Sequence, residues 1–197
     1  MDSKSNKYLP EEHFELDLRN IQLRLDNYHK TLENTKSFRK EWHDQIKKMI
    51  VDTLQHIISK TSLKATVSVK ENIENMEAVV LDLGKVHSGL SEKISQDTDL
   101  KKKIVKTQGG LIYQQLFNGK IMIMIIYPYI EGYGDPKPPL NVEILRPDEL
   151  KQAYILRHVE DMLKEITIWE DFDDEPRSKT SIGFASPVIM KENDKND

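Results

Sequence analysis

A run of lysines is the most concentrated charged feature of the sequence, and its chemistry is that of phosphate recognition. The run contains Lys101, Lys102, Lys103 and Lys106. Lysines beside aromatic side chains on a sheet can follow the phosphate backbone of a nucleic acid while the rings stack on its bases. Lysines also protect exposed sheet edges from pairing with another strand. Because Met and Ile stand where stacking aromatics are needed, edge protection is favoured, and nucleic-acid binding through Lys101–Lys106 is the alternative hypothesis.

Three tyrosines lie close together after the most apolar run of the chain. They are Tyr127, Tyr129 and Tyr133, and a stretch rich in proline and glycine follows up to residue 139. Tyrosine offers a rigid apolar ring with a polar tip, which suits recognition of a peptide or a small ligand. We therefore take the three as candidate partner-binding residues. In the competing interpretation, Tyr127 and Tyr129 only complete the core and the edge of a sheet.

Histidine, serine and cysteine give no catalytic or metal-binding pattern above background. The chain has no cysteine, which excludes disulfides, thiolate nucleophiles and Cys-based metal sites. Its six histidines do not stand at metal-ligand spacing. His87 lies in a polar segment with Ser88, and a second alternative uses it: a ligand-sensing or hydrolytic domain around His87 and the Tyr127–Tyr133 loop. We assign no catalytic residue, no metal site and no cofactor.

The C-terminal end, residues 170–197, reads as an acidic flexible tail that contains one apolar island. Residues 148–197 hold 13 acidic and 7 basic side chains. The island spans residues 181–190, and Ile182 and Phe184 are its candidate partner-binding residues. Such a segment either lies on its own domain or adds to the edge of a partner's sheet. The two possibilities stay open from the sequence.

The element that must position these side chains is a predicted β-hairpin around Asn118-Gly119. This dipeptide favours a two-residue type I′ turn, which needs positive φ at both central positions. A two-residue loop pairs Gln115 with Met122. Residues 121–126 are apolar at every position. A strand that is apolar on both faces is expected in the middle of a sheet, with something packed on each side.

Further strands and a C-terminal helix are predicted around this hairpin. Alternating or β-branched runs predict strands at residues 65–70, 76–83 and 140–145. Residues 84–99 are polar with apolar positions at helical spacing, so a short helix is one interpretation there. Pro147 and the two carboxylates after it predict a helix that opens at that proline and ends near Trp169.

The N-terminal region is predicted to be a disordered start, residues 1–9, followed by a helical arm, residues 10–60. Apolar residues in the arm are spaced alternately by three and four, which is a coiled-coil-like heptad seam with polar positions at Thr35 and Arg39. Poor helix formers at residues 34–37 leave a helical hairpin open as an alternative to one rod. The seam either packs on its own sheet or forms a coiled coil between chains.

Composition places the chain among soluble, cytoplasmic proteins. The net charge is −4, whereas a protein that binds duplex nucleic acid more often has a net basic domain. The N-terminus lacks a signal-peptide core, and the longest apolar run is about half of the roughly 20 residues that a membrane-spanning helix needs. We expect no membrane association.

These observations predict an α+β fold. Residues 61–169 are expected to form a four- to five-stranded, mainly antiparallel sheet with the C-terminal helix on one face. The N-terminal helical arm is expected to cover the other face or to pair with a second copy. The leading function hypothesis is a non-enzymatic interaction or assembly module. Its partner would be a protein, either itself as a homo-oligomer or another subunit of a larger intracellular complex.

Overall fold

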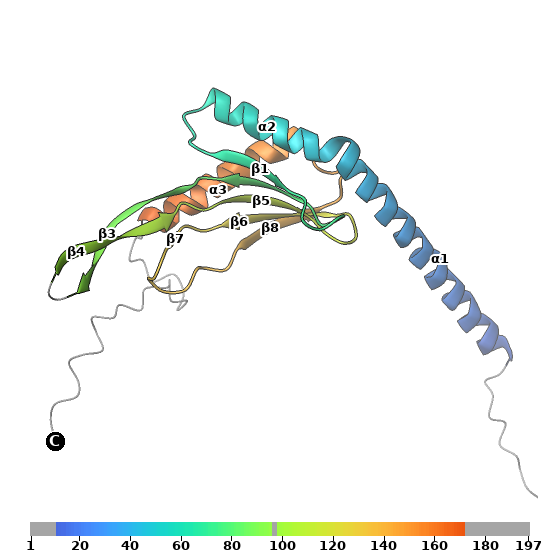
Figure 1. Cartoon of the computed structure of the whole chain (residues 1–197). Coiled ribbons are helices and arrows are strands. Elements are labelled where there is room, and N and C mark those ends of the chain that lie inside the picture. The colour runs from blue at the N-terminus through green and yellow to red at the C-terminus, as the bar shows by residue number, and fades with distance from the viewer. Residues whose placement is uncertain (1–10, 96–97, 172–197) are drawn as a thin grey trace, which may run out of the picture.

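The computed structural model describes residues 11–95 and 98–171, and these residues form an α+β fold (Figure 1). The helical elements are α1 (Glu11–Glu41), the π-helical turn η1 (Trp42–Ile46), α2 (Lys47–Lys60) and α3 (Gln152–Asp171). The strands are β1 (Thr66–Lys70), β2 (Ala78–Asp82), β3 (Lys85–Ser95), β4 (Thr98–Thr107), β5 (Gly110–Gln115), β6 (Ile121–Ile126), β7 (Tyr129–Ile130) and β8 (Leu140–Leu145). The predicted fold class is confirmed.

The strands form two antiparallel sheets. The larger has five strands in the order β1-β2-β5-β6-β8, and the smaller has three in the order β3-β4-β7. The interpretation of residues 84–99 as a short helix is wrong, because this range contains all of β3 and the first two residues of β4. A spacing of four residues fits one face of a strand as well as one face of a helix, so the apolar spacing there did not discriminate.

The central hairpin β5–β6 has a register one residue away from the predicted one. Gln115 pairs with Ile121 instead of Met122. The loop is longer by one residue because Gly119, with φ +78°, follows a turn that its N–H closes on the carbonyl of Leu116 at 2.8 Å. This is the three-residue loop in which glycine takes the left-handed position.

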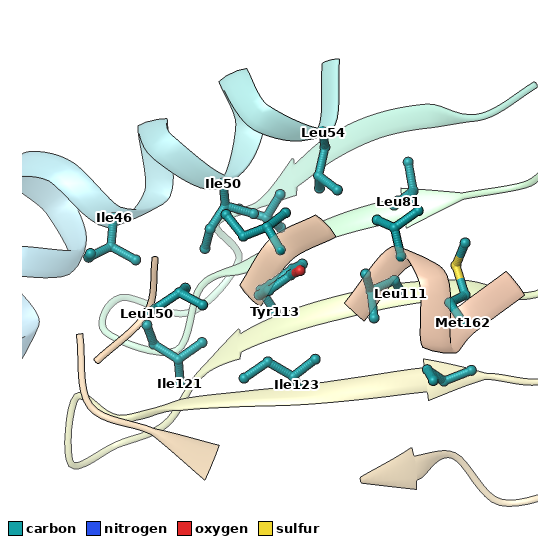
Figure 2. Close-up of a cluster of buried hydrophobic side chains, with 14 of the residues drawn as sticks. Ile46, Ile50, Leu54, Leu81, Leu111, Tyr113, Ile121, Ile123, Leu150 and Met162 are labelled. Carbon is teal, nitrogen blue, oxygen red and sulfur yellow. The ribbon is translucent and has the colours of Figure 1, made fainter. Parts of the chain in front are cut away.

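Helices α2 and α3 cover the same face of the five-stranded sheet. Buried side chains of α2, such as Ile50 and Leu54, share one core cluster with Met162 of α3 and with Leu81 and Tyr113 of the sheet (Figure 2). The expectation that the N-terminal helical region covers the face opposite the C-terminal helix is therefore wrong. Both helices have an apolar stripe, and no pattern in either stripe specifies which side of the sheet it covers.

The second face of the five-stranded sheet is less well covered. Its row of paired residues Val80, Ile112 and Met124 is half-buried, whereas the neighbouring positions on the helix side are fully buried. Within residues 11–95 and 98–171, no helix packs on this face. The expected second covering layer over β6 is not found among the described residues.

Helices α1 and α2 are one continuous rod through η1, so the predicted alternative of a helical hairpin is wrong. In η1 the N–H of Lys47 donates to the carbonyl of Trp42, five residues back. Buried Trp42, Ile46, Ile50 and Leu54 are spaced by four, and this spacing drifts around an α-helix because one turn takes 3.6 residues. The wider π-helical turn takes up part of that drift and keeps these side chains on the sheet side.

Helix α3 begins five residues later than the sequence predicted. The first-turn proline and carboxylates belong to a turn before the helix, in which the Glu149 N–H donates to the Arg146 carbonyl at 3.0 Å. The Glu149 carboxylate accepts a hydrogen bond from the Arg146 N–H at 2.7 Å. The proline and the carboxylates therefore mark this turn, and the helix itself begins only at Gln152.

Candidate functional site

The exposed apolar stripe of α1 is the largest unpartnered feature of the described residues. Six side chains at spacings of four and three share one side of the helix, and each is 41–62% exposed. They are Phe14, Leu18, Ile21, Leu25, Tyr28 and Leu32. We call this set the α1 seam. A helix surface of this kind matches the a and d positions of a heptad repeat, which are normally covered by a partner helix.

The heptad pattern continues past the α1 seam into polar positions, and there the helix packs against the chain's own sheet. Thr35 and Arg39 are half-buried, and an Arg39 guanidinium N–H donates to the carbonyl of Phe117 in the β5–β6 loop. Trp42 is fully buried. Of the two alternatives that the sequence left open, packing on the chain's own sheet is therefore found for the C-terminal part of the heptad pattern.

Two further leucines lie on the opposite side of α1 from the seam. Leu16 and Leu23 are 58% and 61% exposed and stand seven residues apart. At 3.6 residues per turn, Leu23 lies roughly 160° around the helix from Leu25. The pair is too small to form a continuous stripe, and Leu23 provides a control position of the same residue type.

The base of the rod is fixed by a buried carboxylate, Glu77. Its carboxylate accepts hydrogen bonds from Trp42 Nε1 at 3.0 Å and from Lys47 Nζ at 2.8 Å. Burial opposes ionisation of this carboxyl, but the bonds from Lys47 and Trp42 outweigh burial and lower its pKa. Glu77 therefore stays charged and ties η1 and α2 to the segment that precedes β2.

A second polar cluster is built around His158 on the buried side of α3. Its Nδ1 lies 3.1 Å from the Tyr113 hydroxyl, and its Nε2 lies 2.5 Å from the Glu143 carboxylate, which also pairs with Arg157. Burial lowers the pKa of His158 in spite of Glu143. A neutral ring then donates from Nε2 to Glu143 and accepts from Tyr113 at Nδ1.

This cluster has the residue types of a catalytic triad, but its histidine and its tyrosine are closed off from solvent. His158 and Tyr113 are both completely buried, and neither lines an apolar hollow described below. A general base must lie within hydrogen-bond reach of a substrate proton. We therefore interpret His158 as a structural link between β5, β8 and α3.

The three candidate tyrosines do not form one surface. Tyr127 is 5% exposed and donates its hydroxyl to the Glu165 carboxylate of α3 at 2.7 Å. Tyr129 is half-buried in β7, where it pairs with Thr107, and Tyr133 is 36% exposed. The Lys137 ammonium also lies over the Tyr127 ring, with its Nζ 3.5 Å from the ring centroid.

The lysine run forms part of β4 and is divided between the two faces of that strand. Alternation places Lys102 and Lys106 on one face and Lys103 on the other, and the side chain of Lys101 lies outside the described part of the chain. Lys106 is already paired with Glu170 of α3, at 2.7 Å. Nucleic-acid binding through this run stays a prediction, with fewer lysines on one face than the sequence alone suggested.

The other candidates of the sequence lie elsewhere. His87 is exposed in β3, opposite Val105, and lines neither hollow. Ile182 and Phe184 lie outside the described residues.

Apolar hollows are found on the described surface. An apolar hollow of about 250 Å³ lies on the less covered sheet face beside Gly109 and Gly110. Another, of about 490 Å³, lies between the end of α2 and the outer side of α3. Residues 11–95 and 98–171 contain no cluster of three His, Cys, Asp or Glu side chains suited to a metal ion. In the same ranges, no helix has the length and apolar character needed to cross a bilayer.

Comparisons of the chain with models of protein families, with curated proteins and with solved structures find no significant match. Function is therefore inferred from the residues of the chain itself.

Proposed function

We propose that this chain is a non-enzymatic assembly module that associates with a second copy of itself through the α1 seam. The seam carries the proposal, because six large apolar side chains at heptad spacing stay exposed on a helix that leaves the folded domain. About half of each such side chain is exposed, and covering that half contributes about 0.8–1.5 kcal/mol. Six of them on each chain can therefore offset the cost of bringing two chains together.

The polar clusters support an architectural role over a catalytic one. Glu77 and His158 each join helix to sheet, and their hydrogen-bond partners are side chains of the same domain. Groups that do chemistry need access to a substrate and are arranged at a cleft. Both clusters instead hold the base of the rod and the helical layer in place.

The test compares two leucine substitutions on the same helix by light scattering across a concentration series. Leu25→Asp lies in the seam, whereas Leu23→Asp lies on the opposite side of α1 and is the matched control. The unaltered chain is expected to have the mass of two chains. Loss of about 0.8–1.5 kcal/mol from each of the two chains predicts a dissociation constant for Leu25→Asp that is at least roughly tenfold higher than that of the unaltered chain.

The control should dissociate at nearly the same concentration as the unaltered chain, because Leu23 lies outside the seam. A monomeric mass for the unaltered chain at every concentration would contradict self-association. Equal weakening by both substitutions would contradict the role of the seam, because it would point to a general effect on the helix.

A further inference from the structure

The groove between α2 and α3 is a second apolar surface that needs a partner. It holds about 490 Å³ and is lined mainly by apolar side chains. The apolar residues of its lining are Ile57, Leu63, Leu156, Val159 and Leu163. Two of them, Leu156 and Leu163, are 55% and 40% exposed and lie two turns apart on α3. Grooves of this type between helices bind the apolar side of an amphipathic helix.

The border of this groove is mostly basic. Lys60, Lys64 and Lys164 each stand directly next to a lining residue in the sequence, and all three are exposed. By the same measure the acidic residues are Glu160, which lines the groove, and the half-buried Asp161 next to it. A helix that binds here is therefore favoured when it carries carboxylates beside its apolar side chains.

The first described turns of α1 have that composition. Residues 13–18 contain the seam residues Phe14 and Leu18 together with the carboxylates Glu15 and Asp17, and the first basic side chain after them is Arg19. This end of the seam is thus apolar on one side and acidic beside it. It complements the apolar lining and the lysines of the groove.

The arm cannot reach the groove of its own chain. Phe14 is 28 residues from Trp42, which corresponds to about 42 Å of helix that runs away from the domain. The groove lies at the other end of α2, beyond Ile57. Because the rod is continuous through η1, returning the seam to this groove would require breaking the helix. A second copy can supply both surfaces without any such change.

We infer that two copies exchange their arms, so that the N-terminal part of each α1 seam docks in the α2–α3 groove of the other copy. The inference rests on the proposed self-association and adds the surface that receives the seam. Reciprocal exchange closes a dimer and covers both apolar surfaces on both chains. Direct pairing of two α1 helices would leave both grooves uncovered, and a parallel pairing would bring Glu15 and Asp17 close to their own copies.

The chain contains no cysteine, so introduced thiols report contacts without background. The full-length Leu18→Cys variant is mixed with the full-length Leu163→Cys variant, which carries a size tag, and the mixture is oxidised mildly. The control mixture replaces Leu18→Cys by Leu23→Cys, on the opposite side of α1. The seam mixture should give about tenfold more of the mixed disulfide than the control, because a disulfide requires Cα atoms within roughly 7 Å.

The remaining outcomes overturn the inference in distinguishable ways. Disulfides between two Leu18→Cys chains, with no bond to Leu163→Cys, would show α1 paired with α1, which rejects the groove and leaves self-association standing. A separate variant carries both Leu18→Cys and Leu163→Cys in one chain. A disulfide within that chain would show an arm that folds back onto its own groove. No cross-link in a chain of monomeric mass would reject the groove and the proposed self-association together.

Discussion

His158 is an uncharged histidine, although the nearby carboxylates of Glu143 and Asp161 favour its charged form. Four groups lie near the ring. Arg157 and Asp161 belong to α3, the Glu143 carboxylate comes from β8, and the Tyr113 hydroxyl comes from β5. Burial lowers the pKa of the ring from its usual 6.5, and this effect outweighs the attraction of Glu143. The ring is therefore neutral at pH 7 and bridges two strands as both donor and acceptor.

The sign of the resulting pH dependence follows from this lowered pKa. In the unfolded chain the ring binds its proton as pH falls through 6.5, while the folded chain still resists protonation. The free energy of unfolding is therefore expected to decrease as pH falls from about 7.5 to 5.5. Urea unfolding at a series of pH values measures it.

The matched comparison uses two histidines. His158→Gln should be less stable at pH 7.5 and should lose most of the slope, whereas the exposed His56→Gln should keep it. An unchanged slope in His158→Gln would mean that other groups cause the acid sensitivity.

The His158 cluster has no local signature in the sequence, because its members come from separate elements. Glu143 and His158 are 15 residues apart on different elements, and Tyr113 is 45 residues from His158. Only the register of β5 and β8 and the side on which α3 packs bring them together. The same holds for Glu77 and Trp42, which are 35 residues apart. The spacing of residues within one element does not predict contacts between side chains of different elements.

Among the elements, the β5–β6 loop is the one that fixes the direction of the arm. A Cβ added at Gly119 would lie 2.6 Å from Phe38 Cβ and 3.0 Å from the backbone N of Arg39. The loop and the helix are thus in direct contact at the point where α1 leaves the domain.

Gly119→Ala is expected to destabilise the fold by about 2–4 kcal/mol, because alanine meets both the positive φ and this contact. Gly132→Ala is the control, since Gly132 has φ +81° and nothing within 4 Å of an added Cβ. Backbone strain alone predicts about 1 kcal/mol for the control. Urea unfolding measures the free energy of unfolding of both variants. Equal losses would show that the contact with α1 does not contribute to stability.

Elements whose pattern is local were predicted well, and their relations were not. Alternation located the strands 65–70, 76–83 and 140–145, and the heptad spacing located the rod. The hairpin register failed by one residue because Asn118-Gly119 fits both a two-residue loop and the observed longer one. The packing of α2 and α3 on the same sheet face could not be predicted either, because an apolar stripe does not specify which surface it packs against.

At the scale of the whole molecule, the chain is a small layered domain with a long arm (Figure 1). The arm's seam and the α2–α3 groove are joined by one continuous helix through η1, so the number of residues between them sets the rotation of the seam about the rod axis.

This connection can be tested by insertions after Leu32. A repeat of residues 26–32 adds seven residues, which lengthens the arm by about 10 Å and turns the seam by only about 20°. A repeat of residues 28–32 adds five residues and turns it by about 140°. The seven-residue insertion should keep the dimer mass with a longer maximum dimension in X-ray scattering. The five-residue insertion should weaken the dimer, and equal behaviour of the two would contradict a fixed rotation.

The continuous helix also changes what the length of this region means. A loop tolerates almost any number of residues, because its closure cost rises slowly with length. In the rod between Phe14 and Trp42, one residue count sets a distance and a direction together. The arm can therefore be lengthened or shortened without loss of phase only by near-whole numbers of helical turns, such as about 7, 11 or 18 residues, and in the proposed dimer each such step would change the spacing between the two domains by a fixed amount.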